Sequence, residues 1–346
     1  MSSDCDNPEE QLFNQSGNIL ISDQFNNRVI EVTPRGEIVW SFGLGPTNFT
    51  PNSIIGVNDA ERVGDLTLMV GTGIKSGVIP EAPTGVIDNR VILVNKNGKI
   101  IWQYGQFGQT GIGYNLLTTP VQATFISCHK STKNILNGTV LITDQGNNRI
   151  IQVDDQKEIV WQYPGRNINP SDQLNSPSSA EKLKDGNILI ADNGNKRAIE
   201  INKRNIVVRV FTASGTLKSC SFASRLPNGN TLLTDSINNR IIEVNIDDMI
   251  VWQYLTNSEL QSIHSPMPTR GLRLRNGNTL ISDQFNNRVI RINSTVSILA
   301  YYGLPLKSGS GTIGPNNGYN LMTTQLGLYS PSDAKIIGDY TGITPP

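Results

Sequence analysis

Acid–base chemistry has few candidates in this sequence, because the protein has only two histidines, His129 and His264. Histidine is the side chain best suited to act as a general base near neutral pH. His264 precedes Arg270 by a few residues, and we take these two as the candidate catalytic residues of a lyase- or transferase-type enzyme. We interpret His129 as incidental. If the protein is not such an enzyme, its catalytic residues are unknown.

Metal and redox chemistry is weakly supported. Cys5, Cys128 and Cys220 cannot all pair with one another, and their spacing is not that of a metal site. We interpret them as buried or incidental thiols, with no stated role. We expect no metal and no cofactor.

An internal repeat determines the elements that must position these residues. The sequence ISDQFNNRVI occurs identically at residues 21–30 and 281–290, and weaker copies lie between them. The arginine of each copy marks six units: Arg28, Arg90, Arg149, Arg197, Arg240 and Arg288. Spacings of about 43 to 62 residues are typical of propellers or solenoids.

Each unit is predicted to form four antiparallel strands, since short β-branched runs alternate with Asn- and Gly-rich turns. Six such units predict an all-β, six-bladed β-propeller in a single domain, residues 1–346. Residues 331–334 (PSDA) match the opening of another unit at 177–180 (PSSA), so a C-terminal strand should complete the N-terminal blade and remove two sheet edges. The predicted blades are 17–42 plus 331–338, 51–105, 120–163, 177–211, 219–254 and 266–303.

The pattern Leu-x-x-Pro, Gly-Asn, then Ala-Asp-x-x-Asn-x-Arg resembles the NHL-repeat propellers. It is clearest around Asp144, Asp192, Asp235 and Asp283, and the second unit departs from it by lacking the turn aspartate and carrying an insertion, residues 71–86. The resemblance implies a propeller but leaves activity open, because this family includes peptide- and RNA-binding modules, sensors and a few lyases. We interpret the repeated aspartates and arginines as structural clasps of the turns.

Candidate ligand-binding residues come from aligning the inner strands on Pro-x-x-Ala, which selects one residue per blade at the channel mouth. The set is Ser53, Gln122, Ser179, Phe222, Arg270 and Asp333. Arg270 and Asp333 belong to neighbouring blades and could pair with each other. The acidic, calcium-binding ring of lactonase-like propellers is absent, because Asp333 is the one carboxylate expected at this level.

Long loops are predicted on one face, where inter-blade loops and second-to-third-strand loops emerge together. These are residues 105–119, 164–176, 255–265 and 303–330, with the 71–86 insertion, and long loops on a rigid scaffold are where binding residues concentrate. Two of them repeat Gly-Tyr-Asn-Leu, so Tyr114 and Tyr319 are further candidate binding residues. We call this the long-loop face.

Composition limits the partners. Lysines plus arginines equal aspartates plus glutamates at 29 each, which argues against nucleic acid. No apolar run approaches the length of a membrane helix. We therefore expect a non-enzymatic binding or scaffold module, with a protein or small ligand on the long-loop face, and keep a homo-oligomer or filament as an alternative because zero net charge removes self-repulsion. The compartment stays open, with an extracellular or cell-surface protein preferred to a cytoplasmic one.

Overall fold

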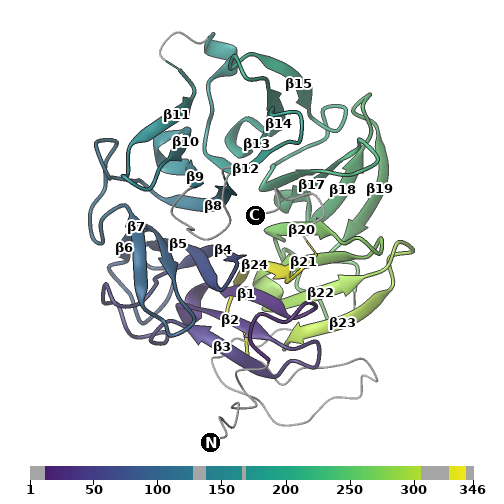
Figure 1. Ribbon diagram of the computed structural model, residues 1–346. Helices are drawn as coiled ribbons and strands as arrows, with labels where there is room; N and C mark the ends of the chain where they lie inside the picture. Colours follow the sequence, from purple (N-terminus) through teal and green to yellow (C-terminus); the bar gives the residue numbers. More distant parts are fainter. Residues whose placement is uncertain (1–11, 128–137, 166–168, 260, 305–326, 340–346) are drawn as a thin grey trace, which may run out of the picture.

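Six four-stranded antiparallel sheets form a ring in the computed structural model, which describes residues 12–127, 138–165, 169–259, 261–304 and 327–339 (Figure 1). From the innermost strand outwards, blade 1 is β24 (Pro331–Ile336), β1 (Ile19–Asp23), β2 (Arg28–Val32) and β3 (Ile38–Phe42), and blade 2 is β4 (Val57–Val63), β5 (Leu66–Ile74), β6 (Val86–Val94) and β7 (Ile100–Tyr104). Blade 3 is β8 (Pro120–Ser127), β9 (Gly138–Asp144), β10 (Arg149–Val153) and β11 (Ile159–Tyr163). The six-bladed propeller is confirmed.

The remaining three blades follow the same order without interruption. Blade 4 is β12 (Pro177–Lys182), β13 (Ile188–Asp192), β14 (Arg197–Ile201) and β15 (Val207–Phe211). Blade 5 is β16 (Phe222–Arg225), β17 (Thr231–Asp235), β18 (Arg240–Val244) and β19 (Ile250–Leu255), and blade 6 is β20 (Arg270–Arg273), β21 (Thr279–Asp283), β22 (Arg288–Ile292) and β23 (Ile298–Gly303). Among the described residues, no helix is long and apolar enough to cross a membrane.

The ring is closed by the C-terminal strand, as expected from the sequence. β24 pairs antiparallel with β1, with Ala334 opposite Ile21 and Ile336 opposite Ile19. Figure 1 shows this strand in yellow beside the purple β1. Blade 1 therefore combines strands from both ends of the described polypeptide, and β24 takes the innermost position so that β1 is not left as an unpaired edge.

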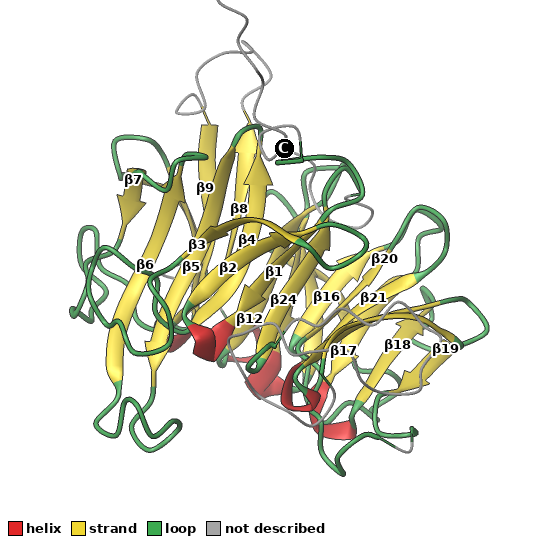
Figure 2. Ribbon diagram, turned by 90° about the horizontal axis from the view of Figure 1, so that it is seen from below, coloured by secondary structure: helices red, strands yellow, loops and turns green. Residues whose placement is uncertain are grey.

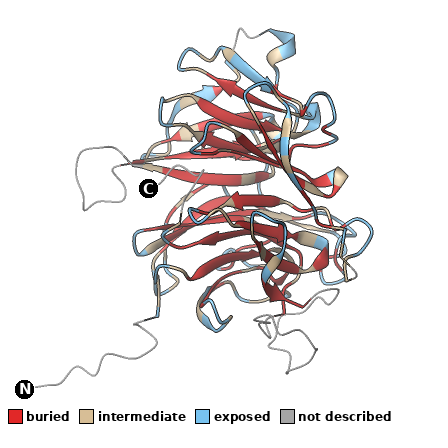
Figure 3. Cartoon of the chain, turned by 90° about the vertical axis from the view of Figure 1, so that its right-hand side faces the viewer, coloured by how far each residue is buried: buried red, intermediate tan, exposed pale blue. Residues whose placement is uncertain are grey.

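The described core contains six large apolar clusters, each shared by two adjacent blades, and two smaller ones. For example, Ile21 and Ile30 of blade 1 pack with Leu280 and Val289 of blade 6. Burial therefore follows the inner strands around the ring, and exposure is concentrated in the turns and the outermost strands (Figure 3). Because every cluster needs both of its blades, the blades stabilise one another laterally.

The repeated Asp-x-x-Asn-Asn-Arg segment forms a short 3-10 turn between the second and third strands. Five such turns occur: η1 (Gln24–Asn26), η2 (Gln145–Asn147), η4 (Asn193–Asn195), η5 (Ser236–Asn238) and η6 (Gln284–Asn286). Each ends in a left-handed residue, such as Asn27 with φ 50°, which explains the preference for Asn there. A further 3-10 turn, η3 (Pro170–Asp172), lies between blades 3 and 4.

Asp and Arg of each repeat form the expected clasp, with Arg Nε bonded to Asp Oδ2 at 2.6–2.9 Å in blades 1, 3, 4, 5 and 6. Blade 2 lacks the turn aspartate, as expected from the sequence, because Gly71 lies opposite Arg90 where the other blades have aspartate. Asp88, two residues before Arg90 rather than five, pairs with that arginine and accepts the backbone N–H of Ile55. The clasp is thus rebuilt from a different sequence position.

Candidate functional site

The innermost strands place one side chain per blade at a common register. We call these six residues the channel ring; they are Asp59, Gln122, Ser179, Phe222, Arg270 and Asp333. Each lies opposite the second-strand residue that immediately precedes the clasp aspartate or, in blade 2, opposite the equivalent residue. All six are buried, and none is more than 6% exposed. The ring is therefore part of the protein interior.

Ser53 does not belong to the ring, contrary to the sequence alignment. It precedes β4, and its hydroxyl oxygen accepts the backbone N–H of Leu44. Asp59 occupies the ring position of blade 2 instead. The alignment on proline missed it because the inner strand of this blade begins with Val57. The repeated dipeptide Asp-Ala, at Asp59-Ala60 and Asp333-Ala334, would have identified it from the sequence.

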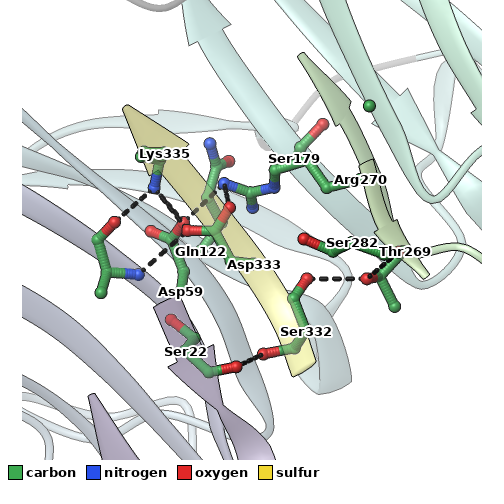
Figure 4. Close-up of polar contacts among 12 residues, drawn as sticks. Ser22, Asp59, Gln122, Ser179, Thr269, Arg270, Ser282, Ser332, Asp333 and Lys335 are labelled. Atoms are coloured by element: carbon green, nitrogen blue, oxygen red, sulfur yellow. Dashed lines mark hydrogen bonds and ion pairs between the residues drawn. The ribbon is translucent and has the colours of Figure 1, made fainter. Parts of the chain in front are cut away.

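Two acids and two bases converge at one side of the ring (Figure 4). Arg270 Nη1 lies 2.7 Å from Asp59 Oδ1 and 2.9 Å from Asp333 Oδ1. Lys335 Nζ, from the same strand as Asp333, lies 2.6 Å from Asp59 Oδ1 and 2.8 Å from Asp333 Oδ2. The expected pairing of Arg270 with Asp333 is therefore present, but Asp59 and Lys335 complete it.

The balance of these charges sets their protonation. Burial raises the pKa of Asp59, but the adjacent Lys335 and Arg270 charges outweigh it and hold that pKa well below its usual range. For Lys335, burial lowers the pKa, and the Asp333 and Asp59 carboxylates outweigh it, so that the pKa lies above its usual value. The cluster is therefore a compensated set of ions instead of a free acid or base.

Ring side chains also fasten each blade to the next through a backbone N–H. Asp333 accepts the N–H of Ala60, Asp59 that of Ala123, Gln122 that of Ala180 and Ser179 that of Ala223. The donor is each time the residue after the next ring position. A polar side chain with an acceptor oxygen is needed for this contact, which explains the residue types at these four ring positions.

The boundary between blades 5 and 6 uses different chemistry because Phe222 has no acceptor. There, Thr234 Oγ1 accepts the N–H of Gly271 at 3.0 Å. A Cβ at Gly271 would lie 2.7 Å from Ile241 Cγ2, so the close approach requires glycine. The Phe222 ring instead contacts the guanidinium of Arg270, whose Cζ lies 4.5 Å from the ring centroid.

A second layer of the inner strands contains two further buried acids that reasoning from the sequence missed. Glu61 accepts the N–H of Phe125, and Glu181 accepts that of Arg225. Burial raises the pKa of Glu61 to about 8 and raises that of Glu181 well above its usual range. Their positions two residues after Asp59 and Ser179 repeat the blade-to-blade contact of the ring.

The candidate catalytic pair is not assembled in the described structure. Arg270 is 5% exposed and fully engaged in the cluster, whereas His264 is exposed and its main-chain oxygen accepts Asn257 Nδ2. Arg270 is bonded to Asp59 and Asp333 and not to His264, and no group of three His, Cys, Asp or Glu among the described residues could hold a metal ion. His129, Cys5 and Cys128 lie outside the described residues; Cys220 is a buried free thiol whose pKa burial raises.

The long-loop face carries the 3-10 turns and the extended hairpin of blade 2 (Figure 2). Part of the 71–86 insertion is strand, because β5 and β6 continue through Ile74 and from Val86. Ile74, Ile79 and Ala82 form a small separate core with Ile55. Side chains from blade 1 and the neighbouring loops pack against it: Phe25, Phe49, Phe107 and Tyr329.

Charge is distributed unequally between the two sets of connections. Loops 43–56 and 105–119 contain no Asp, Glu, Lys or Arg, and Lys196 is the one charged residue in the five four-residue turns that begin with the 3-10 segments. On the other face, four of the five residues in turn 154–158 are charged. Large apolar side chains are exposed in the charge-poor set, with Leu44 at 56%, Ile237 at 54% and Phe285 at 41%.

Of the two candidate tyrosines in the loops, only Tyr114 lies among the described residues. Tyr114 is 64% exposed and its hydroxyl donates to the main-chain oxygen of Gln156 in blade 3, at 3.4 Å. This contact locates Tyr114 at the outer boundary between blades 2 and 3. Tyr319 lies outside the described residues.

Comparisons with known proteins identify a shared fold. No family model and no curated protein matches the sequence. Among solved structures, virginiamycin B lyase from Staphylococcus aureus is similar with a TM-score of 0.53 and 15% identity, over 85% of this chain and 83% of that one. A protein of unknown function from Bacteroides caccae has a TM-score of 0.54 and 14% identity, over 84% of this chain and 94% of that one.

A third similar structure is a catalytically inactive variant of the S. aureus lyase with quinupristin. It has a TM-score of 0.52 and 14% identity, over 86% of both proteins. At these identities the likeness extends to the fold and not to the activity. The protein is a six-bladed β-propeller whose structural neighbours include a lyase.

Proposed function

We propose that this protein is an NHL-type propeller that acts as a binding or scaffold module, with its interaction surface on the long-loop face. The observation that carries the proposal is a charge-poor part of this face: loops 43–56 and 105–119 and four of the five 3-10 turns contain no charged residue, and they expose Leu44, Ile237 and Phe285. Depletion of charge and exposed aromatic or aliphatic side chains favour a protein interface. The ordered hairpin of blade 2 adds a fixed projection to the same face.

The partner is a neutral or apolar protein surface, or a second copy of this protein. The charge-poor loops and turns of this face would meet those of a second copy without like-charge repulsion, so self-association through them is compatible with the same observation. The Asp–Arg clasps and the channel ring are, in this proposal, the scaffold that holds the loops.

The enzyme alternative, a lyase or transferase using His264 and Arg270, receives less support. Arg270 is ion-paired with Asp59 and Asp333 inside the ring, and His264 lies on the surface. The lyases among the similar structures share the fold with this protein at 12–15% identity, which transfers no activity.

Charge-introducing variants test the surface. Ile237→Lys with Phe285→Lys alters the long-loop face, whereas Val160→Lys with Val251→Lys alters exposed positions of the outer strands. After melting curves establish that both proteins fold, sedimentation equilibrium and quantitative recovery of co-purifying proteins are compared. We expect association to fall in the first variant and to persist in the second. The reverse pattern would remove the long-loop face as the binding surface.

A further inference from the structure

Five of the six Asp–Arg clasps hold the backbone of the loop that enters their blade. The aspartate accepts an N–H from Tyr329, Ile55, Thr118, Asn175 or Ser219. The arginine donates to a loop carbonyl of Gly327, Ser53, Leu116, Gln173 or Thr216. In four of these blades the carbonyl lies two residues before the N–H, so the clasp forms hydrogen bonds with the same three-residue stretch of loop backbone in each.

Blade 6 makes neither of these contacts. Pro266 stands where the other loops supply the N–H, as shown by its carbonyl, which accepts Phe285 N just as that of Tyr329 accepts Phe25 N. Proline has no N–H to donate. Asp283 Oδ1 and Arg288 Nη2 are consequently buried without a hydrogen-bond partner among the described residues.

A carboxylate takes the place of the loop carbonyl in this blade. Glu259 Oε2 lies 3.0 Å from Arg288 Nη1 and accepts the Tyr301 hydroxyl at 3.0 Å, while Glu259 Oε1 accepts the Tyr254 hydroxyl at 2.6 Å. The three donors are buried: Arg288 is 0%, Tyr254 4% and Tyr301 8% exposed. Three converging donors on one carboxylate form a built anion site, and this arrangement occurs in no other described clasp.

Glu259 fills that site incompletely and is itself partly exposed to solvent. Its side chain is 22% exposed, and it leaves Arg288 Nη2 unused, although a guanidinium binds a carboxylate best through two parallel N–H groups. The loop is also held by other bonds, from Ile263 N to Asn286 Oδ1 and from Phe285 N to the Pro266 carbonyl. Removal of the Glu259 side chain therefore leaves the loop attached.

We propose that Arg288, Tyr254 and Tyr301 form a carboxylate-binding site for an acidic group of a partner, and that Glu259 is an internal occupant which that group displaces. The site lies beside η6, so this inference rests on the proposed binding function and adds to that face a specific binding point for an acidic group of the partner. The carboxylate comes from an acidic side chain or from the C-terminus of a polypeptide, and both present the same two oxygens.

Acetate is the first probe, with the full-length protein carrying Glu259→Ala. We expect acetate to raise the melting temperature of this variant more than chloride at equal ionic strength, because a ligand that binds the folded state stabilises it. The wild type should show no such difference. Adding Tyr301→Phe should weaken the acetate effect about tenfold in apparent Kd, the order expected from one hydrogen bond to a charged group. If Glu259→Ala does not fold, Glu259→Ser also removes the occupying carboxylate while keeping a small polar group, and it is tested in the same way.

The outcomes separate a binding site from a loop anchor. If Glu259 is only an anchor, its variants lose stability and acetate does not restore it beyond chloride, which overturns the proposal. An equal acetate effect in the wild type overturns the role of Glu259 as occupant. Alanine tripeptides with a free or an amidated C-terminus, and an end-capped tripeptide with a central glutamate, then distinguish the two sources. A positive acetate result together with failure of the charged-face variants would retain this site and reject the wider surface.

Discussion

Asp59 Oδ2 accepts the backbone N–H of Ala123 at 3.1 Å, while Oδ1 of the same carboxylate receives Arg270 and Lys335. One side chain of blade 2 thereby binds blades 1, 3 and 6. Because the charge of Asp59 is buried, its partners would be left uncompensated without it. The channel ring therefore links neighbouring blades to one another at the centre of the propeller.

Replacing Asp59 with alanine should lower the free energy of unfolding by about 3–5 kcal/mol, the cost of breaking a buried ion pair from one side. Ser179→Ala is the matched control, since it removes the same kind of contact, to Ala223 N, without a charge. That control should cost about 1–2 kcal/mol. Chemical denaturation measures both, and equal losses would contradict the importance of the ion cluster.

Glu61 should make the stability depend on pH. Its pKa is raised to about 8 by burial, from 4.5 in the unfolded state, so the folded protein retains a proton that the unfolded protein releases. The stability from this group is complete below pH 4.5, falls as the pH rises towards 8 and is constant above it.

Glu61→Gln removes that dependence. The variant should therefore gain stability over the wild type between pH 4.5 and 8, and keep the gain above pH 8. Denaturation of both proteins across this range measures the difference, in which contributions of the other carboxyl groups largely cancel. A difference that is constant with pH would show that Glu61 titrates normally.

The clasps can be compared between two blades. Asp235 accepts bonds from Arg240, Asn238 and the loop residue Ser219, whereas Asp283 accepts bonds from Arg288 and Asn286 and leaves one oxygen unpaired among the described residues. Asp235→Ala should cost about 1–3 kcal/mol without selectively removing a binding activity. Asp283→Ala should cost less, because fewer bonds are lost and Glu259 still neutralises Arg288. The opposite order in denaturation experiments would contradict the missing loop contact in blade 6.

Closure gives a further prediction. Ending the protein before Tyr329 removes β24 and with it Asp333 and Lys335, so that β1 becomes an unpaired edge and the Asp59–Arg270 pair loses its two other partners. We expect aggregation or a large fall in melting temperature. A truncated protein that melts like the full-length one would show that the β1–β24 pairing contributes little.

The fold was predictable because its determinants recur in the sequence, whereas the contacts of the site were not. Arg28 and its five counterparts, with the PSDA segment at the C-terminus, are sufficient for six blades and their closure. Asp59 was missed because its strand lacks the initial proline, and Asp88 because its spacing to Arg90 is shorter. The pairing of Asp59 with Arg270 joins residues 211 positions apart, and no local pattern specifies it.

The Glu259 contacts were hidden for a different reason. They occur in blade 6, where the entering loop departs from the repeat pattern. Alignment with the other units therefore offers no residue that corresponds to Glu259. Pro266 was visible in the sequence, but its meaning depends on the N–H that the other five loops supply to their clasps. The hydrogen bonds of the other five clasps are visible only in the structure, and they are needed to recognise that Pro266 removes one.

Self-association is the last prediction. Tyr114 is 64% exposed in a loop that contains no charged residue, and the sequence GYNL around it recurs at Tyr319. An exposed tyrosine combines apolar contact area with a hydrogen-bonding group, which suits an interface. We expect the protein to associate with increasing concentration in sedimentation experiments, and Tyr114→Ala combined with Tyr319→Ala to weaken that association at least several-fold. A contact between unlike surfaces would extend into a filament, and a contact between like surfaces would end at a dimer.

Tyr114→Phe is the control, because it keeps the ring and removes only the weak bond to Gln156. A monomer at all concentrations would contradict the prediction, and association unaffected by the double variant would assign the contact to another surface.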